Sequence, residues 1–307
     1  MAIVVVGSVA FDTIQSPFGK AEKILGGSAT YFSLAASYFT DVRIVAVVGE
    51  DFGPEYESVL RQRGVNLDGL QRAAGLTFHW GGEYGENVNE AKTHFTHLNV
   101  FEKFQPQIPQ QYLDSQFLFL ANIDPILQAQ VRRQMRNVRM VGGDTMNFWI
   151  NGKRPELLAT LKLVDLLLIN DTEAKMLAGE ANLLRAANKV MAMGPKALVI
   201  KHGEYGATIF FGDRKFGIGH HPFRAPALPL DEVRDPTGAG DSFAGGFMGY
   251  IASQEELNRE VLKRAMFYGG VMGSFAVERF GPERLQNLTR EEIDARFEVF
   301  RELTHLD

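Results

Sequence analysis

Short apolar runs recur along the chain, and each has the composition of a β-strand buried on both faces. These runs are Ile3–Val6, Arg43–Val48, Phe117–Leu120, Val138–Val141, Leu166–Ile169 and Ala197–Ile200. Stretches of helical character separate them, and in Ser28–Phe39 the apolar stripe of the helix consists of Phe32, Ala35, Ala36 and Phe39. This alternation predicts an α/β fold with helices on both faces of a parallel sheet.

Polar side chains follow several of these strands. They are Asn122, Asp124, Asp144, Asn170 and Lys201. In an open α/β sheet, ligands bind beyond the carboxyl ends of the strands, so these groups are expected to converge on one edge. Solvation of a loop explains any one of them equally well. Together they favour a binding site.

Two segments do not follow the alternation of strands and helices. Phe11–Leu25 and Leu76–Phe104 have no helical periodicity, and in the second one Phe78 and Trp80 alternate with His79 as in a strand. We expect these segments to form a small β appendage, here called the lid. A lid could close over a substrate, or it could pair with a second subunit to form a homodimer.

Composition is that of a globular protein. The 307 residues are 45% hydrophobic and 22% charged, which suits a single α/β domain over residues 1–307 with the lid as an insertion. The formal net charge of −5 argues against a partner bound through nucleic-acid phosphates. No apolar run approaches the ~18 residues of a membrane span, and no basic segment precedes Ile3–Val6, so we expect a cytoplasmic protein without membrane partners.

The sharpest motif lies near the C-terminus, where a turn rich in Pro and Gly opens into a helix. It reads Asp235-Pro236-Thr237-Gly238-Ala239-Gly240-Asp241-Ser242-Phe243. The helix has an apolar face of Phe243, Phe247, Tyr250 and Ile251. Glycines let a backbone approach a ligand closely, and free N–H groups at a helix start bind anions. The motif therefore predicts a phosphate site.

A carboxylate in such a site would repel phosphate unless it has a chemical task. Asp241 suits that task if it takes a proton from a hydroxyl group that attacks the phosphate. The alternative is that Asp241 caps its helix, as aspartate often does. The pattern GxxxxGK[ST] is absent, and Phe243 stands where a dinucleotide fingerprint needs its third glycine. Other phosphate loops therefore fit less well.

These residues resemble the ribokinase-like (PfkB) family of sugar and nucleoside kinases. The motif from Asp235 to Phe243 matches the family's C-terminal signature. Earlier elements are similar in the same order: the strand from Gly7 to Asp12, the Gly26-Gly27 pair, Asn170-Asp171-Thr172-Glu173 and the turn Lys201-His202-Gly203-Glu204-Tyr205-Gly206. The resemblance implies a ribokinase-like three-layer α/β/α fold with a mostly parallel central sheet and a small β lid.

The resemblance also implies roles on the phosphate side. Asp241 would be the general base, and the amides of Gly238, Ala239 and Gly240 would bind the transferring phosphoryl group. Other residues would line the ATP site, namely Asn170, Lys201, Gly203, Gly206, Thr237, Gly238 and Gly240. Asn170 and Glu173 would hold Mg²⁺, largely through water; their alternative role is a helix cap followed by a first-turn acid. Asp235 matches a position that in some relatives helps hold a monovalent cation such as K⁺.

On the substrate side, the resemblance points to Asp12, which can accept two hydroxyl groups, and to the Gly26-Gly27 turn. The family's asparagine after the two glycines is absent, so Thr30 or Tyr31 is expected to face the substrate instead. Aromatic groups of the lid suit either a base or sugar face or a dimer interface: Phe78, Trp80, Tyr84, His94 and Phe95.

The sequence thus predicts an ATP-dependent enzyme that phosphorylates a hydroxymethyl group of a sugar or sugar derivative. A nucleoside kinase with the same residues is the main alternative. A catalytically silent ligand sensor on the same fold is the second.

Overall fold

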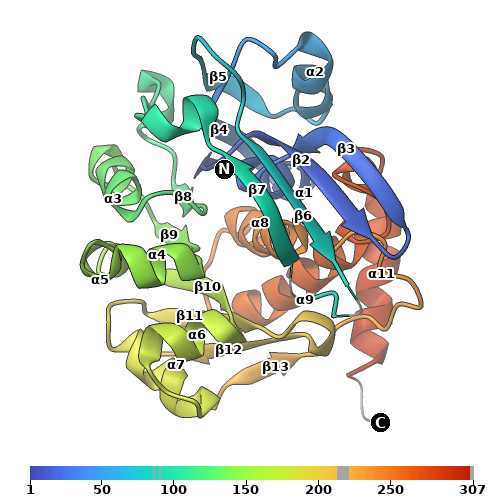
Figure 1. The fold of residues 1–307 in the computed structure, drawn as a ribbon. Coiled ribbons are helices and arrows are strands. Elements are labelled where there is room, and N and C mark those ends of the chain that lie inside the picture. Colours follow the sequence, from blue (N-terminus) through green and yellow to red (C-terminus); the bar gives the residue numbers. More distant parts are fainter. Residues whose placement is uncertain (86, 90, 213–220, 305–307) are drawn as a thin grey trace.

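A mostly parallel sheet runs through the centre of the molecule (Figure 1). The computed structural model describes residues 1–85, 87–89, 91–212 and 221–304. Within these residues the sheet has nine strands in the order β13-β12-β11-β10-β9-β8-β1-β4-β5. In chain order they are β1 Ala2–Val6, β4 Asp41–Val48, β5 Asn66–Arg72, β8 Phe117–Leu120, β9 Met140–Gly143, β10 Leu166–Asn170, β11 Ala197–Lys201, β12 Ala207–Phe211 and β13 Phe223–Ala225.

Every apolar run singled out in the sequence overlaps a strand of this sheet, although the run Val138–Val141 is shifted by two residues from β9 Met140–Gly143. In β1, Val4 and Val5 are both fully buried, and they belong to different apolar clusters on opposite faces. In the order of the sheet, all neighbouring strands from β5 to β11 pair in parallel. At the other edge β12 pairs antiparallel with both β11 and β13. Strands β5, β12 and β13 were not predicted. β5 and β13 are the edge strands and lack the continuous apolar run of central strands. β12 is an interior strand that pairs with both β11 and β13, and four of its five residues are buried, so its place in the sheet does not explain why it was missed.

Helices cover both faces of the sheet, as expected. One face packs against a cluster that draws buried residues from α1 Ser28–Ala36, α2 Pro54–Gln62, α8 Ala239–Ala252, α9 Arg259–Ala276, α10 Glu283–Gln286 and α11 Arg290–Glu302. The opposite face packs against α3 Pro125–Gln134, α4 Asn147–Gly152, α5 Arg154–Leu161, α6 Asp171–Ala178 and α7 Leu183–Met191. Short 3₁₀ turns lie at Asn99–Lys103, Gln110–Tyr112 and Gly203–Tyr205.

The two segments predicted as the lid form one small sheet, shown in blue and teal in Figure 1. Its strands are β2 Ala10–Ser16, β3 Gly19–Gly26, β6 His79–Tyr84 and β7 Ala91–His97, in the order β3-β2-β6-β7. β2 pairs antiparallel with β3 and parallel with β6, and β6 pairs antiparallel with β7. We call this the lid sheet.

Helices α1 and α8 start side by side, and this places the candidate site. Gly27 precedes α1 with φ 95°, and a side chain there would come within 2.5 Å of the Ser8 carbonyl oxygen. Gly238 precedes α8 in the left-handed region at φ 74°, and its Cα lies against the ring of Tyr31. The sequence predicted an apolar stripe on α1, but every residue of α1 is buried because α8 packs against it.

Candidate active site

Asp241 lies in the first turn of α8. Gly238 is the N-cap residue, and no side chain caps this helix start. In the described part of the chain the Asp241 carboxylate accepts no hydrogen bond, so the alternative role as a helix cap does not hold here. Of the three predicted anion-binding amides, that of Ala239 already donates to the Pro236 carbonyl oxygen at 3.2 Å.

The surroundings of Asp241 suit a general base. Burial and the nearby Asp144 carboxylate raise its pKa to about 7, while the Lys201 ammonium group works in the opposite direction. A base with a pKa near the operating pH is ionised often enough to act and still basic enough to take a proton. The chemistry expected of Asp241 is therefore consistent with its electrostatic environment.

Lys201 and Asp144 face each other across the carboxyl ends of β11 and β9. Lys201 Nζ lies 3.7 Å from Asp144 Oδ2, and both side chains are largely buried. A Cβ atom on Gly240 would stand 3.0 Å from the same Nζ, so the ammonium group lies directly beside the start of α8. From the sequence, Asp144 is only one of several polar residues that follow a strand. Its pairing with Lys201 depends on tertiary structure.

Lys201 and the surrounding carboxylates shift one another's pKa values. Burial raises the pKa of Asp144, and Lys201 opposes that rise. Burial works to lower the pKa of Lys201, but the carboxylates of Asp144, Glu173 and Asp241 raise it overall. A fixed positive charge beside the N–H groups of a helix start is an arrangement that stabilises phosphoryl oxygens, so this geometry suits the predicted phosphate site.

Asn170 and Glu173 form a capping box at the start of α6. Asn170 Oδ1 accepts from the Glu173 N–H at 2.7 Å, and Glu173 Oε2 accepts from the Asn170 N–H at 2.8 Å. The alternative role of this pair, a helix cap followed by a first-turn acid, is therefore present in the structure. Burial, then the Asp144 carboxylate, raise the pKa of Glu173 to about 7, which shows that it lies in the same electrostatic environment as Asp241.

The turn after β11 was predicted to line the ATP site. Gly203 begins a 3₁₀ turn with φ 58°, and Gly206 ends it with φ 90°. The amide oxygen of Asn89, in the loop between β6 and β7, lies directly against the Cα of Gly203. The lid therefore reaches the predicted nucleotide side, a contact that the sequence did not indicate.

Asp12 occupies the inner part of the lid sheet. Its side chain is buried and lies against Gly26, which has room for no side chain there. Burial, followed by the Asp235 carboxylate, raises the pKa of Asp12 to about 8. The Asp241 carboxylate also raises this pKa, whereas a hydrogen bond from the Gly27 amide lowers it. Asp12 and Asp241 thus lie within electrostatic range of each other, which is consistent with the substrate and base roles predicted for them.

Thr30 and Tyr31 were expected to face the substrate. They are 0% and 1% exposed, so neither offers surface to a substrate in this conformation. Within the described chain their hydroxyl groups are buried without a hydrogen-bond partner. Burial, with Asp235 and Asp12 nearby, raises the pKa of Tyr31 well above its usual value.

Asp235 connects the turn before α8 to the C-terminal part of the chain. Its fully buried carboxylate accepts from the Thr237 N–H at 2.9 Å and from the Gly281 N–H at 2.8 Å. These bonds hold the turn in place. The role of Asp235 toward a monovalent cation stays a prediction.

Thr237 also contacts the lid. Its hydroxyl oxygen lies 3.2 Å from that of Tyr84 at the end of β6. Tyr84 was considered only as one of several lid aromatics, and no sequence spacing links it to Thr237. The signal that could have found it is its place at the end of a lid strand.

Comparison with known proteins identifies the family. The model of the pfkB family of carbohydrate kinases matches residues 2–287. This chain belongs to the pfkB family. A cytidine kinase from Thermococcus kodakarensis is 30% identical over 275 residues, covering 86% of this chain and 94% of the relative. A nucleoside kinase from Methanocaldococcus jannaschii is 23% identical over 272 residues, covering 88% of this chain and 83% of the relative.

Solved structures confirm the ribokinase fold. The nucleoside kinase of Burkholderia thailandensis in complex with inosine has a TM-score of 0.74 at 20% identity, covering 97% of this chain and 98% of that one. A probable sugar kinase from Rhizobium etli has a TM-score of 0.79 at 18% identity, with coverages of 97% and 98%. The chain is thus a pfkB-family kinase of the sugar and nucleoside type.

A pfkB-family kinase uses ATP and, in general, a divalent metal. In the described ranges no group of three or more His, Cys, Asp or Glu side chains is placed to hold a metal ion, nor is any helix long and apolar enough to cross a membrane. A Mg²⁺ ion at Asn170 and Glu173 would therefore be held mainly by ATP phosphates and water. Magnesium commonly binds in this way, so the residues present fit it.

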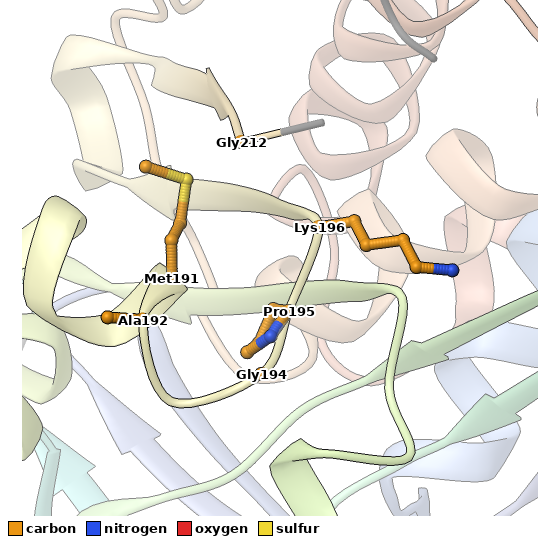
Figure 2. Close-up of a pocket in the computed structure, with 6 residues that line it drawn as sticks. All are labelled: Met191, Ala192, Gly194, Pro195, Lys196 and Gly212. Atoms are coloured by element: carbon orange, nitrogen blue, oxygen red, sulfur yellow. The ribbon is translucent and has the colours of Figure 1, made fainter. Parts of the chain in front are cut away.

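A separate hollow lies far from these groups in the kinase. Figure 2 shows it at the amino end of β11, and it encloses about 430 Å³ between Met191, Ala192, Gly194, Pro195, Lys196 and Gly212. Lys196 extends away from Met191 and Ala192, and its Nζ lies 2.7 Å from Asp165 Oδ1. Ligands of α/β sheets bind at the carboxyl ends of strands, so this hollow is not part of the candidate site.

Proposed function

We propose that this pfkB-family chain is an ATP-dependent nucleoside kinase that phosphorylates a hydroxymethyl group, with Asp241 as general base. The observation that carries the proposal is the placement of Asp241 at the start of α8, with its pKa raised to about 7 and Lys201 beside Gly240. The sequence alone favoured a sugar derivative as acceptor. The cytidine and nucleoside kinases among its relatives support the nucleoside alternative instead.

The proposed reaction moves the γ-phosphoryl group of ATP to a hydroxyl group of the nucleoside. The hydroxyl oxygen of the nucleoside attacks the γ-phosphorus of ATP, and its proton passes to the Asp241 carboxylate. The bond from the γ-phosphorus to the bridging oxygen breaks, and ADP leaves with that electron pair. Lys201 and the N–H groups at the start of α8 stabilise charge on the phosphoryl oxygens. Mg²⁺, when bound with ATP, neutralises part of the phosphate charge.

The substrate side supports a polyhydroxy group. Asp12 is a buried carboxyl group that lies against Gly26, within electrostatic range of Asp235 and Asp241. Ribose hydroxyls that donate to Asp12 favour its ionised form and offset the cost of its burial.

The test is Mg²⁺-ATP consumption across a panel of nucleosides, pentoses, hexoses and sugar phosphates, with Asp241→Asn measured alongside. We expect turnover on nucleosides and a loss of about 10²–10⁴ in kcat for the variant, since positioned general bases contribute that much. An unchanged circular dichroism spectrum would show that the variant folds.

Each other outcome has its own meaning. Near-normal turnover by Asp241→Asn would contradict the assignment of the base. Turnover on free sugars alone would restore the sugar kinase reading. Nucleotide binding with no turnover on any acceptor would support the sensor alternative.

A further inference from the structure

Strand pairing sorts the aromatic residues of the lid sheet onto two faces. Asp12 in β2 pairs with Trp80 in β6, so their side chains point to the same face. Tyr84 lies four residues after Trp80 in the same strand, so it shares this face, and its hydroxyl reaches Thr237. This inner face is therefore the one turned toward Asp12 and the start of α8.

Phe95 lies on the outer face. It pairs with Gly81, one residue after Trp80, so its side chain points away from Asp12. Its ring packs at 5.0 Å from the ring of His79 and at 4.8 Å from that of His97. Of the lid aromatics, Trp80 and Tyr84 thus lie on the face that adjoins the substrate side, and Phe95 lies on the opposite face.

Trp80 is held in position but not enclosed. Its Nε1–H donates to Thr93 Oγ1 at 3.3 Å, and its six-membered ring extends over Gly82, where a Cβ atom would be 2.5 Å away. The side chain is partly exposed, and among the described residues no aromatic ring packs against it. A partly exposed, oriented indole on the inner face is a surface on which a flat ring can stack.

We propose that Trp80 stacks on the heterocyclic base of the nucleoside whose ribose is bound at Asp12. This rests on the proposed function and specifies which lid residue distinguishes a nucleoside from a free sugar. Asp12 and Trp80 are paired on neighbouring strands ~4.8 Å apart, so a ligand that contacts Asp12 on this face lies beside Trp80. A base attached directly to the ribose would cover the Trp80 indole, whereas a free pentose would leave it uncovered.

Direct binding can be followed by fluorescence, because the chain has only two tryptophans. In a Trp149→Phe background the emission comes from Trp80 alone. We expect saturable quenching by cytidine or adenosine and none by ribose at the same concentration. Equal quenching by ribose would overturn the proposal.

Kinetics adds a second readout. Base–aromatic stacking contributes enough that Trp80→Leu should raise the KM for the nucleoside about tenfold while the KM for ATP stays unchanged. Trp80→Phe should recover most of the loss, because a phenyl ring also stacks. Phe95→Leu is the matched control: it removes an aromatic ring from the same sheet on the outer face, and the nucleoside KM should stay near that of the wild type.

The outcomes separate the two proposals. If the wild-type chain phosphorylates nucleosides but Trp80→Leu has a normal KM, the stacking role is wrong and the kinase assignment stands. If Phe95→Leu and Trp80→Leu are equally impaired, the effect comes from lid stability, and stacking is again wrong. If the wild type neither phosphorylates nucleosides nor shows quenching by them, both proposals fail.

Discussion

The hydroxyl group of Tyr84, at the end of lid strand β6, lies 3.2 Å from the hydroxyl group of Thr237, in the turn before α8. A second contact joins Asn89 of the lid to Gly203 on the predicted nucleotide side. The lid hairpin thus touches both loops between which phosphate transfer is proposed. Closure of this kind keeps water away from a phosphoryl group and completes the site.

Tyr84→Phe should loosen this closure. The variant keeps the ring and removes one hydrogen bond, whose net contribution is of the order of 0.5–1.5 kcal/mol, so the lid should open about 2- to 10-fold more often. Water would then reach ATP more easily. We expect the ratio of ATP hydrolysis to nucleoside phosphorylation to rise by a similar factor, measured by ADP release against product formation.

The matched change is Thr237→Val, which removes the partner hydroxyl. Because both variants break the same hydrogen bond, the double variant should have the same ratio of ATP hydrolysis to nucleoside phosphorylation as either single variant. Additive effects would mean that the two hydroxyl groups act independently, and the coupling between lid and loop would be wrong.

The neighbours of Asp241 predict opposite shifts in the pH dependence of activity. kcat/KM should fall as the pH drops through the pKa of Asp241, which is about 7. Asp144 raises that pKa and Lys201 lowers it, so Asp144→Asn should move the acid limb to lower pH and Lys201→Met should move it to higher pH. A pH profile of each variant measures this.

Two controls belong to that experiment. Lys201→Met leaves Asp144 buried without its partner and is expected to destabilise the fold, so its melting temperature must be recorded. Asp144→Asn keeps the shape of the side chain, so it tests the direction of the shift in the acid limb without loss of packing. Shifts of the same sign in both variants would contradict the electrostatic assignment.

Asp241→Asn should stabilise the protein while inactivating it. Folding raises the pKa of this carboxyl group from 3.8 to about 7, so the folded state binds its proton more tightly than the unfolded state does. Wild-type stability from this group is therefore present below pH 4 and is lost as the pH rises to about 7. Asparagine mimics the neutral form at every pH.

The melting temperature of Asp241→Asn relative to wild type should thus increase between about pH 4 and pH 7 and level off above. Differential scanning calorimetry in a pH series checks this. A variant less stable than wild type at pH 8 would show that the ionised carboxylate is not strained in the folded site.

Glu173 has a capping role and a predicted metal role, and two substitutions separate them. Glu173→Gln keeps an oxygen that can accept from the Asn170 N–H, so the capping box and the melting temperature should be retained. Loss of the charge should raise the Mg²⁺ concentration needed for half-maximal rate. Glu173→Ala should lose about 1 kcal/mol of stability as well.

The Mg²⁺ titration at fixed ATP is the deciding measurement. An unchanged Mg²⁺ dependence in Glu173→Gln would leave Glu173 as a helix cap only.

Much of the fold could be read from the sequence because central strands of a parallel sheet are buried on both faces. That burial demands continuous apolar runs such as Phe117–Leu120, which forms β8 without a residue of difference. Edge strand β5 has alternating burial and polar residues, and β13 is three residues long. Neither leaves a pattern that stands out from a loop.

The sequence by itself determined the chemistry of the motif that ends in Asp241, since glycines before a helix start and an acid within it are local properties. Tertiary structure alone decided what surrounds that acid. Asp144 follows β9, Glu173 lies in the first turn of α6 after β10, and Lys201 ends β11. They converge only because these parallel strands end at one edge of the sheet. The lid follows the same logic: Trp80 and Tyr84 face inward because β6 pairs with β2 in one particular register, and a shift by one residue would turn both outward.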